Sequence, residues 1–264
     1  MEEFWINSDE STLYCRKRGT GQPLLMIHGA CTDSDFFLDT ALILSQYFTV
    51  VIYDRMGSGR SMSAGFADFS VMRHAKDAAL IIRHIGCPCH VIAHSAGTTV
   101  AMQLAQSYPG LVSKMLLHEP VDSEFIERES DDEHELLEIN SLVSEGRVSG
   151  AILRFLERLG ETDPRARKHT PEEESRSDAN CIHFIQNEFI PVFQFTADAS
   201  VLKDTDITIG LGELSRSTSR WDIAQKISRK LNAPLVYYPG SHNCAFDLPA
   251  EFAYLSAGVL LTKT

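Results

Sequence analysis

The sequence contains no hydrophobic run long enough to cross a membrane. A transmembrane helix needs about 18 consecutive apolar residues, and every apolar run in the 264 residues is shorter. The first residues, Met1-Glu2-Glu3-Phe4, lack the basic start and the apolar stretch of a secretory signal. We therefore expect a cytoplasmic protein with no membrane partner.

Positive charge is also scarce. Lys and Arg total 24 against 36 Asp and Glu, which gives a formal charge of -12 at pH 7. A protein of this charge is repelled at long range by the phosphates of nucleic acids and of anionic lipids. We expect neither as a partner.

Cysteine motifs are absent although cysteines are present. The closest pair, Cys87 and Cys89, is separated by one residue, so it matches neither a redox CxxC motif nor half of a zinc site. We expect free thiols in a reducing compartment and no metal site. The six residues are Cys15, Cys31, Cys87, Cys89, Cys181 and Cys244.

What the sequence does contain is an alternation of short apolar runs and amphipathic segments. Unbroken runs such as Pro23–Ile27 are typical of strands buried on both faces of a parallel sheet. Helical patterns joined by short connections predict an α/β fold, with a mostly parallel central sheet flanked by helices. We expect a hairpin at 4–15, strands at 23–27, 48–53, 91–94, 112–118, 207–212 and 234–238, and helices at 35–46, 71–85, 97–107, 221–231 and 249–261.

The pattern changes in the second half of the chain. We predict a helical cap inserted at 121–205 into a core formed by 1–120 and 206–264. Residues 122–138 hold nine carboxylates and one Arg, which indicates a solvated helix face or loop. The segment 163–177 is predicted to be an exposed connection. The helical patterns of the insertion cover 136–143, 148–159 and 180–195.

A serine lies where a strand pattern turns into a helix pattern. Ser95 is flanked by the small residues Ala93 and Gly97. Such a turn pushes the serine out of the strand end, and the small neighbours let strand and helix approach each other. The motif is the G-x-S-x-G pattern with Ala in the first glycine position. Taken alone, it also fits a serine that caps an ordinary helix; Ser95 is our candidate nucleophile.

The other groups that an acyl-transfer serine needs also follow predicted strands. His242 lies after the last strand and is the candidate general base. The candidate oxyanion donors are two backbone N–H groups, that of Ala96 at a helix N-terminus and that of Ala30. We expect structural roles for His28 and His94.

These landmarks, in their order, resemble the α/β-hydrolase superfamily. The resemblance implies a triad of Ser, acid and His, an insertion that acts as a cap, and no cofactor. It also implies that Asp54 and its glycine-rich turn are structural. The landmarks are His28-Gly29-Ala30, the DRMGSGRS stretch at 54–61, Ala93-His94-Ser95-Ala96-Gly97, the helical insertion, and Pro239-Gly240-Ser241-His242.

The acid of the triad departs from the commonest family pattern. Relatives usually carry Asp three residues after the Gly that ends the strand following the cap, and here that position is Ser215. Glu119, at the end of the strand before the cap, occupies the alternative position of some relatives and is our candidate. A buried charge there needs a partner such as an imidazole N–H. Glu213 is the second candidate; Asp206, or no side-chain acid, stays open.

The predicted activity is that of a cofactor-independent serine hydrolase. It would cleave a carboxylic ester or related acyl compound through an acyl-enzyme on Ser95. Haloalkane dehalogenase and epoxide hydrolase activities are disfavoured, because these relatives form an ester with an Asp at this turn, where the present sequence has Ser95. A carbon–carbon bond hydrolase, a perhydrolase, a non-catalytic ligand-binding protein and a homodimer stay open. A small-molecule substrate with an apolar group is indicated by the apolar residues of the insertion: Ile182, Phe184, Ile185, Phe189, Ile190, Val192, Phe193 and Phe195.

Overall fold

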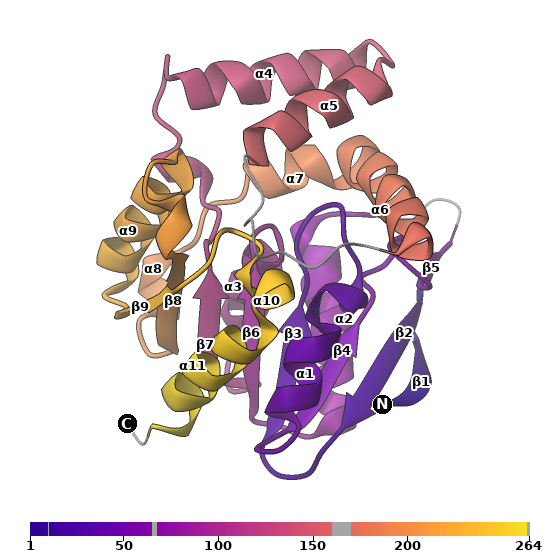
Figure 1. Cartoon of the computed structure of the whole chain (residues 1–264), viewed down its shortest axis with the longest axis vertical. Coiled ribbons are helices and arrows are strands. Elements are labelled where there is room, and N and C mark those ends of the chain that lie inside the picture. Colours follow the sequence, from indigo (N-terminus) through magenta and orange to yellow (C-terminus); the bar gives the residue numbers. More distant parts are fainter. Residues whose placement is uncertain (10, 65–67, 160–169, 263–264) are drawn as a thin grey trace.

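One twisted sheet forms the centre of the molecule (Figure 1). The computed structural model describes residues 1–9, 11–64, 68–159 and 170–262. Its strands are β1 (Glu2–Asn7), β2 (Ser11–Arg18), β3 (Pro23–Ile27), β4 (Thr49–Tyr53), β5 (Met62–Ser63), β6 (Cys89–His94), β7 (Val112–His118), β8 (Asp206–Gly212) and β9 (Leu235–Tyr238).

The sheet is mostly parallel, as predicted. Its order is β1-β2-β4-β3-β6-β7-β8-β9, with β5 paired to β2. From β4 to β9 every neighbouring pair is parallel, whereas β1, β2 and β4 pair antiparallel. The carboxyl ends of the parallel strands therefore meet along one edge, where an open α/β sheet binds its ligands.

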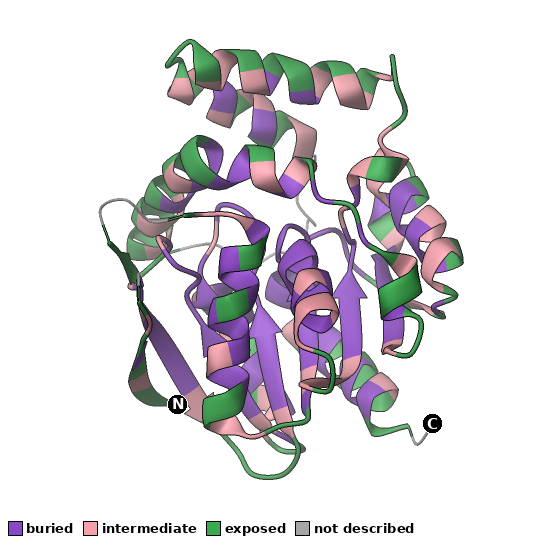
Figure 2. Cartoon of the chain, turned by 180° about the vertical axis from the view of Figure 1, so that it is seen from behind, coloured by how far each residue is buried: buried purple, intermediate pink, exposed green. Residues whose placement is uncertain are grey.

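Helices cover both faces of the sheet, which explains why the central strands are continuously apolar. One face carries α1 (Leu38–Leu44), preceded by the short turn η1 (Ser34–Phe37), together with α10 (Cys244–Asp247) and α11 (Pro249–Leu261). The other face carries α2 (Val71–Ile85), α3 (Gly97–Ser107) and α9 (Ser219–Leu231). In Figure 2 the central strands are buried and the outer helix faces are exposed. Two hydrophobic cores thus fix the sheet from both sides.

Four further helices lie over the carboxyl edge of the sheet (Figure 1). They are α4 (Asp131–Ser144), α5 (Val148–Leu159), α6 (Pro171–His183) and α7 (Phe189–Phe193), and they follow the short turn η2 (Ser123–Phe125). A fifth helix, α8 (Ala199–Leu202), packs instead beside α3 and α9. The acidic stretch at 122–138 runs from η2 into α4. Its residues Asp131, Asp132 and Glu133 form the first turn of α4, where Ser130 caps the helix and carboxylates suit the helix dipole.

The prediction of one helix over 180–195 is wrong in its middle. The turn η3 (Phe184–Glu188) is π-helical and separates α6 from α7. A π-helical turn adds a residue to the helical repeat and changes which side chains face inward. Here it buries Glu188 completely, next to the core residue Arg55. The side chains form an ion pair between the inserted helices and the sheet domain.

The predicted connection over 163–177 is also wrong over its second part. Helix α6 begins at Pro171, because the Thr170 hydroxyl accepts a hydrogen bond from the Glu173 N–H and the Glu173 carboxylate accepts one from the Thr170 N–H. Proline at the first helical position strengthens this start. Residues 163–169 of the predicted connection lie outside the described residues.

Two further observations concern the cysteines and the length of the helices. All six cysteines are free thiols, and Cys87 alone among them is exposed. No helix in the described ranges is long and apolar enough to cross a membrane.

Candidate active site

Ser95 lies on a sharp turn between β6 and α3, as the motif predicts. Its φ is 51°, in the left-handed region that a residue with a side chain seldom adopts. The Ser95 N–H donates a hydrogen bond of 2.9 Å to the carbonyl of His118 on β7. Gly97 lets the new helix approach β3, because a Cβ there would lie 2.5 Å from the His28 carbonyl oxygen. Close packing therefore maintains the strained turn.

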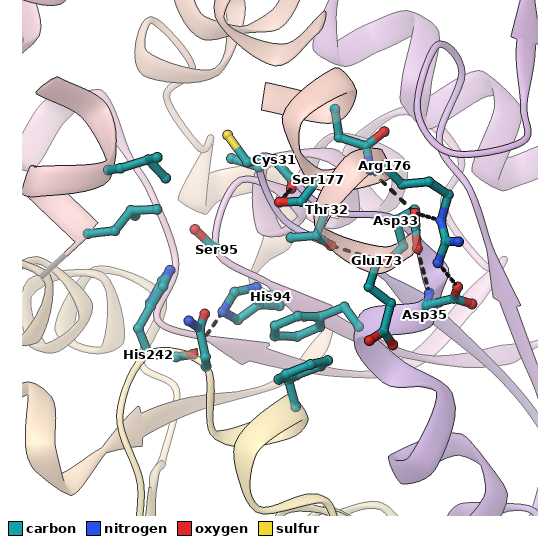
Figure 3. Close-up of a pocket in the computed structure, with 17 residues that line it drawn as sticks. Cys31, Thr32, Asp33, Asp35, His94, Ser95, Glu173, Arg176, Ser177 and His242 are labelled. Atoms are coloured by element: carbon teal, nitrogen blue, oxygen red, sulfur yellow. Dashed lines mark hydrogen bonds and ion pairs between the residues drawn. The ribbon is translucent and has the colours of Figure 1, made fainter. Parts of the chain in front are cut away.

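His242 lies on the loop after β9 and is buried. Its Nδ1 is 2.7 Å from Oε2 of Glu119, and its carbonyl oxygen is 2.9 Å from Nε2 of His94. These contacts fix the imidazole by its ring and by its backbone. In Figure 3 the side chains of His242 and Ser95 lie at the same side of one cavity. Since Nδ1 is bound to Glu119, Nε2 is the nitrogen available to a reacting group.

Glu119 directly follows β7 and is almost completely buried. Besides His242 it binds the Gly212 N–H, which donates to Oε1 at 3.1 Å. Nε of Arg220, on α9, lies 3.4 Å from Oε2. Burial alone would raise the pKa of this carboxyl, but the hydrogen bond and charge of His242 and the Ser215 hydroxyl lower it well below its usual value. The carboxylate is therefore ionised and paired.

The other candidate acids lie elsewhere. Glu213, in the short turn η4 (Glu213–Ser215), forms an ion pair of 2.6 Å with Arg216, and its side chain is 39% exposed. Asp206 begins β8 at the opposite edge of the sheet, where it pairs with Lys114 at 3.3 Å. The structure thus brings Glu119, and not Glu213 or Asp206, to His242. Ser215, at the position of the usual family acid, is buried beside Glu119.

The two backbone groups predicted to bind an oxyanion lie next to Ser95. Ala96 precedes the first residue of α3, and Ala30 follows Gly29 after β3. A Cβ on Gly29 would lie 3.1 Å from Cβ of Ser95, so the two turns pack directly against each other. Among the described residues, neither the Ala30 N–H nor the Ala96 N–H donates a hydrogen bond to another backbone group. Arg55 supports the turn after β3 by donating a hydrogen bond of 3.0 Å from Nη2 to the Gly29 carbonyl.

Burial keeps the site histidines neutral. It lowers the pKa of His242 below its usual value, against the opposing effect of Glu119, and the charge of Arg220 lowers it further. Burial also lowers the pKa of His118 to about 4. His94 lies between His118 and His242, with ring centroids 5.6 Å and 4.5 Å away. A neutral imidazole is the form that accepts a proton from a hydroxyl.

The two histidines for which structural roles were expected, His28 and His94, each form a hydrogen bond with a backbone group. Nε2 of His28 accepts a hydrogen bond of 3.0 Å from the Arg55 N–H, and His94 binds the His242 carbonyl. Asp54 accepts from Ser34 and from Arg60 and so anchors the glycine-rich turn.

Two cavities meet at Ser95, and Ala30 and Leu159 also line both. The large cavity offers about 220 Å3, and the small cavity about 40 Å3, to the centres of water-sized molecules. The large cavity is also lined by Cys31, Thr32, Asp33, Asp35, Phe36, His94, Leu156, Glu173, Arg176, Ser177, Asn180, His242, Asn243 and Phe246. The small cavity is also lined by Ala96, Glu119, Pro120, Val121, Asp122, Ile126, Phe155, Arg158, Phe184, Phe193, Arg220 and Ile223.

The sequence analysis did not find Arg158 and Arg220. Arg220 donates hydrogen bonds to the carbonyls of Arg158 and Leu159 at the end of α5, and it also lies beside Glu119. Both arginines lie on helices with no local motif, so long-range contacts such as the hydrogen bonds from Arg220 to the end of α5 bring them to the site. Within the described ranges, no cluster of three or more His, Cys, Asp or Glu side chains could hold a metal ion.

Fold and site together define a class of protein. A parallel sheet with helices on both faces carries a serine on a strained strand–helix turn, and a His–Glu pair from two later strand ends lies at the same cavity. A family model described as "alpha/beta hydrolase fold" matches residues 22–147, which include Ser95 and Glu119. The chain therefore has the α/β-hydrolase fold.

Comparison with individual proteins agrees with this assignment. The chain is 25% identical over 242 residues to the uncharacterized hydrolase YraK of Bacillus subtilis, covering 88% of this chain and 86% of that protein. It is 31% identical over 133 residues to a non-heme haloperoxidase of Rhodococcus erythropolis, covering 49% and 48%. A solved structure of an alpha/beta hydrolase from Sphaerobacter thermophilus has a TM-score of 0.74 at 19% identity, covering 97% and 100%. This last likeness concerns the fold.

Proposed function

We propose that the protein is a serine hydrolase that cleaves carboxylic esters or related acyl compounds through an acyl-enzyme on Ser95. The observation that carries the proposal is the 2.7 Å contact between Glu119 and Nδ1 of His242, at a cavity that Ser95 also lines. A buried carboxylate on one imidazole nitrogen fixes the tautomer whose other nitrogen accepts a proton. The match of residues 22–147 to the alpha/beta hydrolase fold supports the same chemistry.

In the acylation step, Oγ of Ser95 attacks the carbonyl carbon while Nε2 of His242 takes the hydroxyl proton. The N–H groups of Ala30 and Ala96 stabilise the oxyanion of the tetrahedral intermediate. When the intermediate collapses, the bond to the leaving oxygen breaks, and this oxygen receives the proton from His242. Water then attacks the acyl-enzyme with His242 again as base, which releases the acid and restores Ser95.

The test is hydrolysis of 4-nitrophenyl acetate by the wild type and by Ser95→Ala and His242→Gln. We expect each substitution to reduce kcat by at least about a thousandfold, because nucleophile and base act as one unit. Ser107→Ala, at the other end of α3, is the matched control and should retain the wild-type rate. If the wild type turns over no faster than Ser95→Ala, the protein is a non-catalytic binder and the proposal fails.

A second candidate is perhydrolysis, in which hydrogen peroxide replaces water in the attack on the acyl-enzyme and a peracid leaves. The observation in its favour is the similarity to a protein named a non-heme haloperoxidase. Peracid formation from an acetate ester in the presence of hydrogen peroxide distinguishes the two candidates. Perhydrolysis is excluded if peroxide changes neither the rate nor the product.

A further inference from the structure

The two cavities at Ser95 differ in their relation to the catalytic groups. His242 lines the large cavity but not the small one. Ala96, one of the proposed oxyanion donors, lines the small cavity but not the large one. A carbonyl carbon bound to Ser95 therefore has the base on one side and an enclosed space on the other.

This asymmetry indicates which half of an ester substrate occupies which cavity. The leaving oxygen must receive its proton from His242, so the leaving group has to extend into the large cavity. The acyl chain, on the opposite side of the carbonyl carbon, then extends into the small cavity. We infer that the substrates are esters that join a short-chain acid to a larger, partly polar alcohol, with an acyl group of up to about four carbons. This inference rests on the proposed function.

The volume of the small cavity sets the chain length. A water-sized group needs about 10 to 15 Å3 of cavity volume open to its centre. The small cavity, with about 40 Å3 of such volume, therefore holds about three groups of this size. Counted beyond the carbonyl carbon, three groups correspond to a butyryl chain. The walls are packed side chains from both domains, since Phe155 and Ile223 are buried and Phe193 contacts Phe189 with a ring distance of 4.9 Å. A longer chain would have to displace them.

The charges at the small cavity are already paired. Arg158 binds Asp132 and Glu135, and Arg220 binds two carbonyls and lies next to Glu119. Nε of Arg220 has no hydrogen-bond partner among the described residues, but both arginine charges face carboxylates, and aromatic or aliphatic groups surround them. The small cavity therefore suits an uncharged alkyl chain rather than a second carboxylate.

The large cavity has a different lining. Phe36, Leu156 and Phe246 contribute apolar surface, whereas Thr32 and Ser177 contribute hydroxyl groups. In Figure 3 the polar side chains gather on the side away from His242, where Arg176 binds Asp33 and Asp35. Its volume of about 220 Å3 is several times that of the small cavity. An alcohol with an apolar part next to the ester and a polar far end fits this division.

The experiment compares 4-nitrophenyl acetate, butyrate and octanoate, which share one leaving group. We expect kcat/KM for the acetyl and butyryl esters to exceed that for the octanoyl ester by at least about tenfold. With acetate esters of increasingly large alcohols, from methyl to 2-naphthyl, kcat/KM should not fall. A preference for octanoate would overturn the inference while leaving the proposed function intact, whereas no turnover above Ser95→Ala would contradict the proposed function itself.

Substitutions in the walls make the test specific. Phe193→Ala enlarges the small cavity and should raise the octanoate-to-acetate ratio of kcat/KM by at least about tenfold; Ile223→Ala is the second variant if the first does not fold. Leu156→Ala, in the wall of the large cavity alone, should change the preference among alcohols and leave that ratio within about twofold. If Leu156→Ala changes the acyl ratio and both small-cavity variants do not, the assignment is reversed.

Discussion

Glu119 occupies a backbone conformation that its role in the site explains. Its φ of 46° is in the left-handed region, an uncommon conformation for Glu. The conformation is stabilised because Glu119 donates its N–H to Gly210 and accepts from Gly212 and His242. Three of the non-glycine residues with positive φ, Cys31, Ser95 and Glu119, lie at the site. Strain of this kind is typical of residues placed for chemistry.

Glu119→Gln should lower kcat by about a thousandfold to ten-thousandfold, because an amide can favour the wrong imidazole tautomer and removes the negative charge that stabilises imidazolium. Glu213→Gln is the matched control and should remain within about twofold of the wild type, since the Glu213 side chain pairs with Arg216 at the surface. Steady-state kinetics on one ester measures both. Equal losses in the two variants would remove Glu119 from the triad.

Arg220 is a positioning residue whose charge acts on His242. The guanidinium lowers the pKa of His242, because a nearby positive charge disfavours imidazolium. Arg220→Met should therefore raise the pKa of His242. In a plot of kcat/KM against pH, the fall in kcat/KM on the acid side, the acid limb of the plot, should then move to higher pH. Arg220→Lys keeps a positive charge and should shift the limb less. A lower rate with an unmoved limb in both variants would indicate a structural role only.

The residues of the site differ in how far the sequence alone predicts them. Ser95 and His242 lie in short motifs at strand ends, so their placement follows from local pattern. Glu119 could be proposed because it directly follows an apolar strand and occupies the alternative acid position of some relatives in the resembling family. Arg220 could not, because its contact with Glu119 depends on the angle between α9 and β7 and has no sequence signal of its own.

At the scale of elements, the π-helical turn η3 connects the inserted helices to the core through Glu188. Its carboxylate binds Arg55, and it also lies 3.1 Å from Nε2 of His183 and 3.5 Å from Nε2 of His74. Arg55 in turn supports the Gly29 carbonyl in the turn that precedes Ala30. The position of the inserted helices is thus coupled to the proposed oxyanion donors.

Glu188→Gln should reduce the free energy of unfolding by about 3 to 5 kcal/mol, because it leaves the Arg55 charge buried without its partner. The double variant Arg55→Met, Glu188→Leu should lose less, since it leaves no buried charge at this pair. Denaturant unfolding measures both. A double variant less stable than Glu188→Gln would show that the pair stabilises the fold by more than its burial costs.

Element boundaries were predictable where hydrophobic period and caps agree. Strand β3 and helices α2 and α11 begin and end where the pattern predicts. The inserted region was less predictable. In α6 the charged surface pattern conceals a capped helix, and the π-helical turn depends on the burial of Glu188 rather than on a local preference.

At the scale of the whole molecule, buried neutral histidines make stability depend on pH. The unfolded chain protonates His118 near its usual pKa of 6.5, whereas burial lowers the pKa in the folded chain to about 4. Between these values the unfolded state binds more protons, so stability falls as the pH falls. One such residue contributes a slope of at most about 1.4 kcal/mol per pH unit. His28, whose pKa is lowered by burial to about 3, acts in the same direction.

The expected result is a fall in the free energy of unfolding between pH 7 and pH 5. His118→Phe is the test variant, because both ring nitrogens lack hydrogen-bond partners within the described part of the chain and the ring packs against Tyr238 and Phe252. The variant should lose stability less steeply over this range. Denaturant unfolding at several pH values measures the slope, and an unchanged slope would contradict the neutral buried state of His118.

The fold as a whole follows from alternation, since apolar runs separated by helical patterns specify a parallel sheet covered on both faces. The division of the space at Ser95 into a large and a small cavity does not follow from this alternation. The small cavity is formed by Phe155 and Phe193 from the inserted helices and by Ile223 from α9, and the packing of long-range neighbours decides how much room they leave.

The most direct test of the central claim is covalent labelling by an alkyl fluorophosphonate, read by intact mass and by peptide mapping. The structure predicts one adduct, on the peptide that contains Ser95, and its loss in Ser95→Ala. His242→Gln should slow the labelling strongly, because the serine then lacks its base. A folded wild type that takes no label, or a label that persists in Ser95→Ala, would contradict the account.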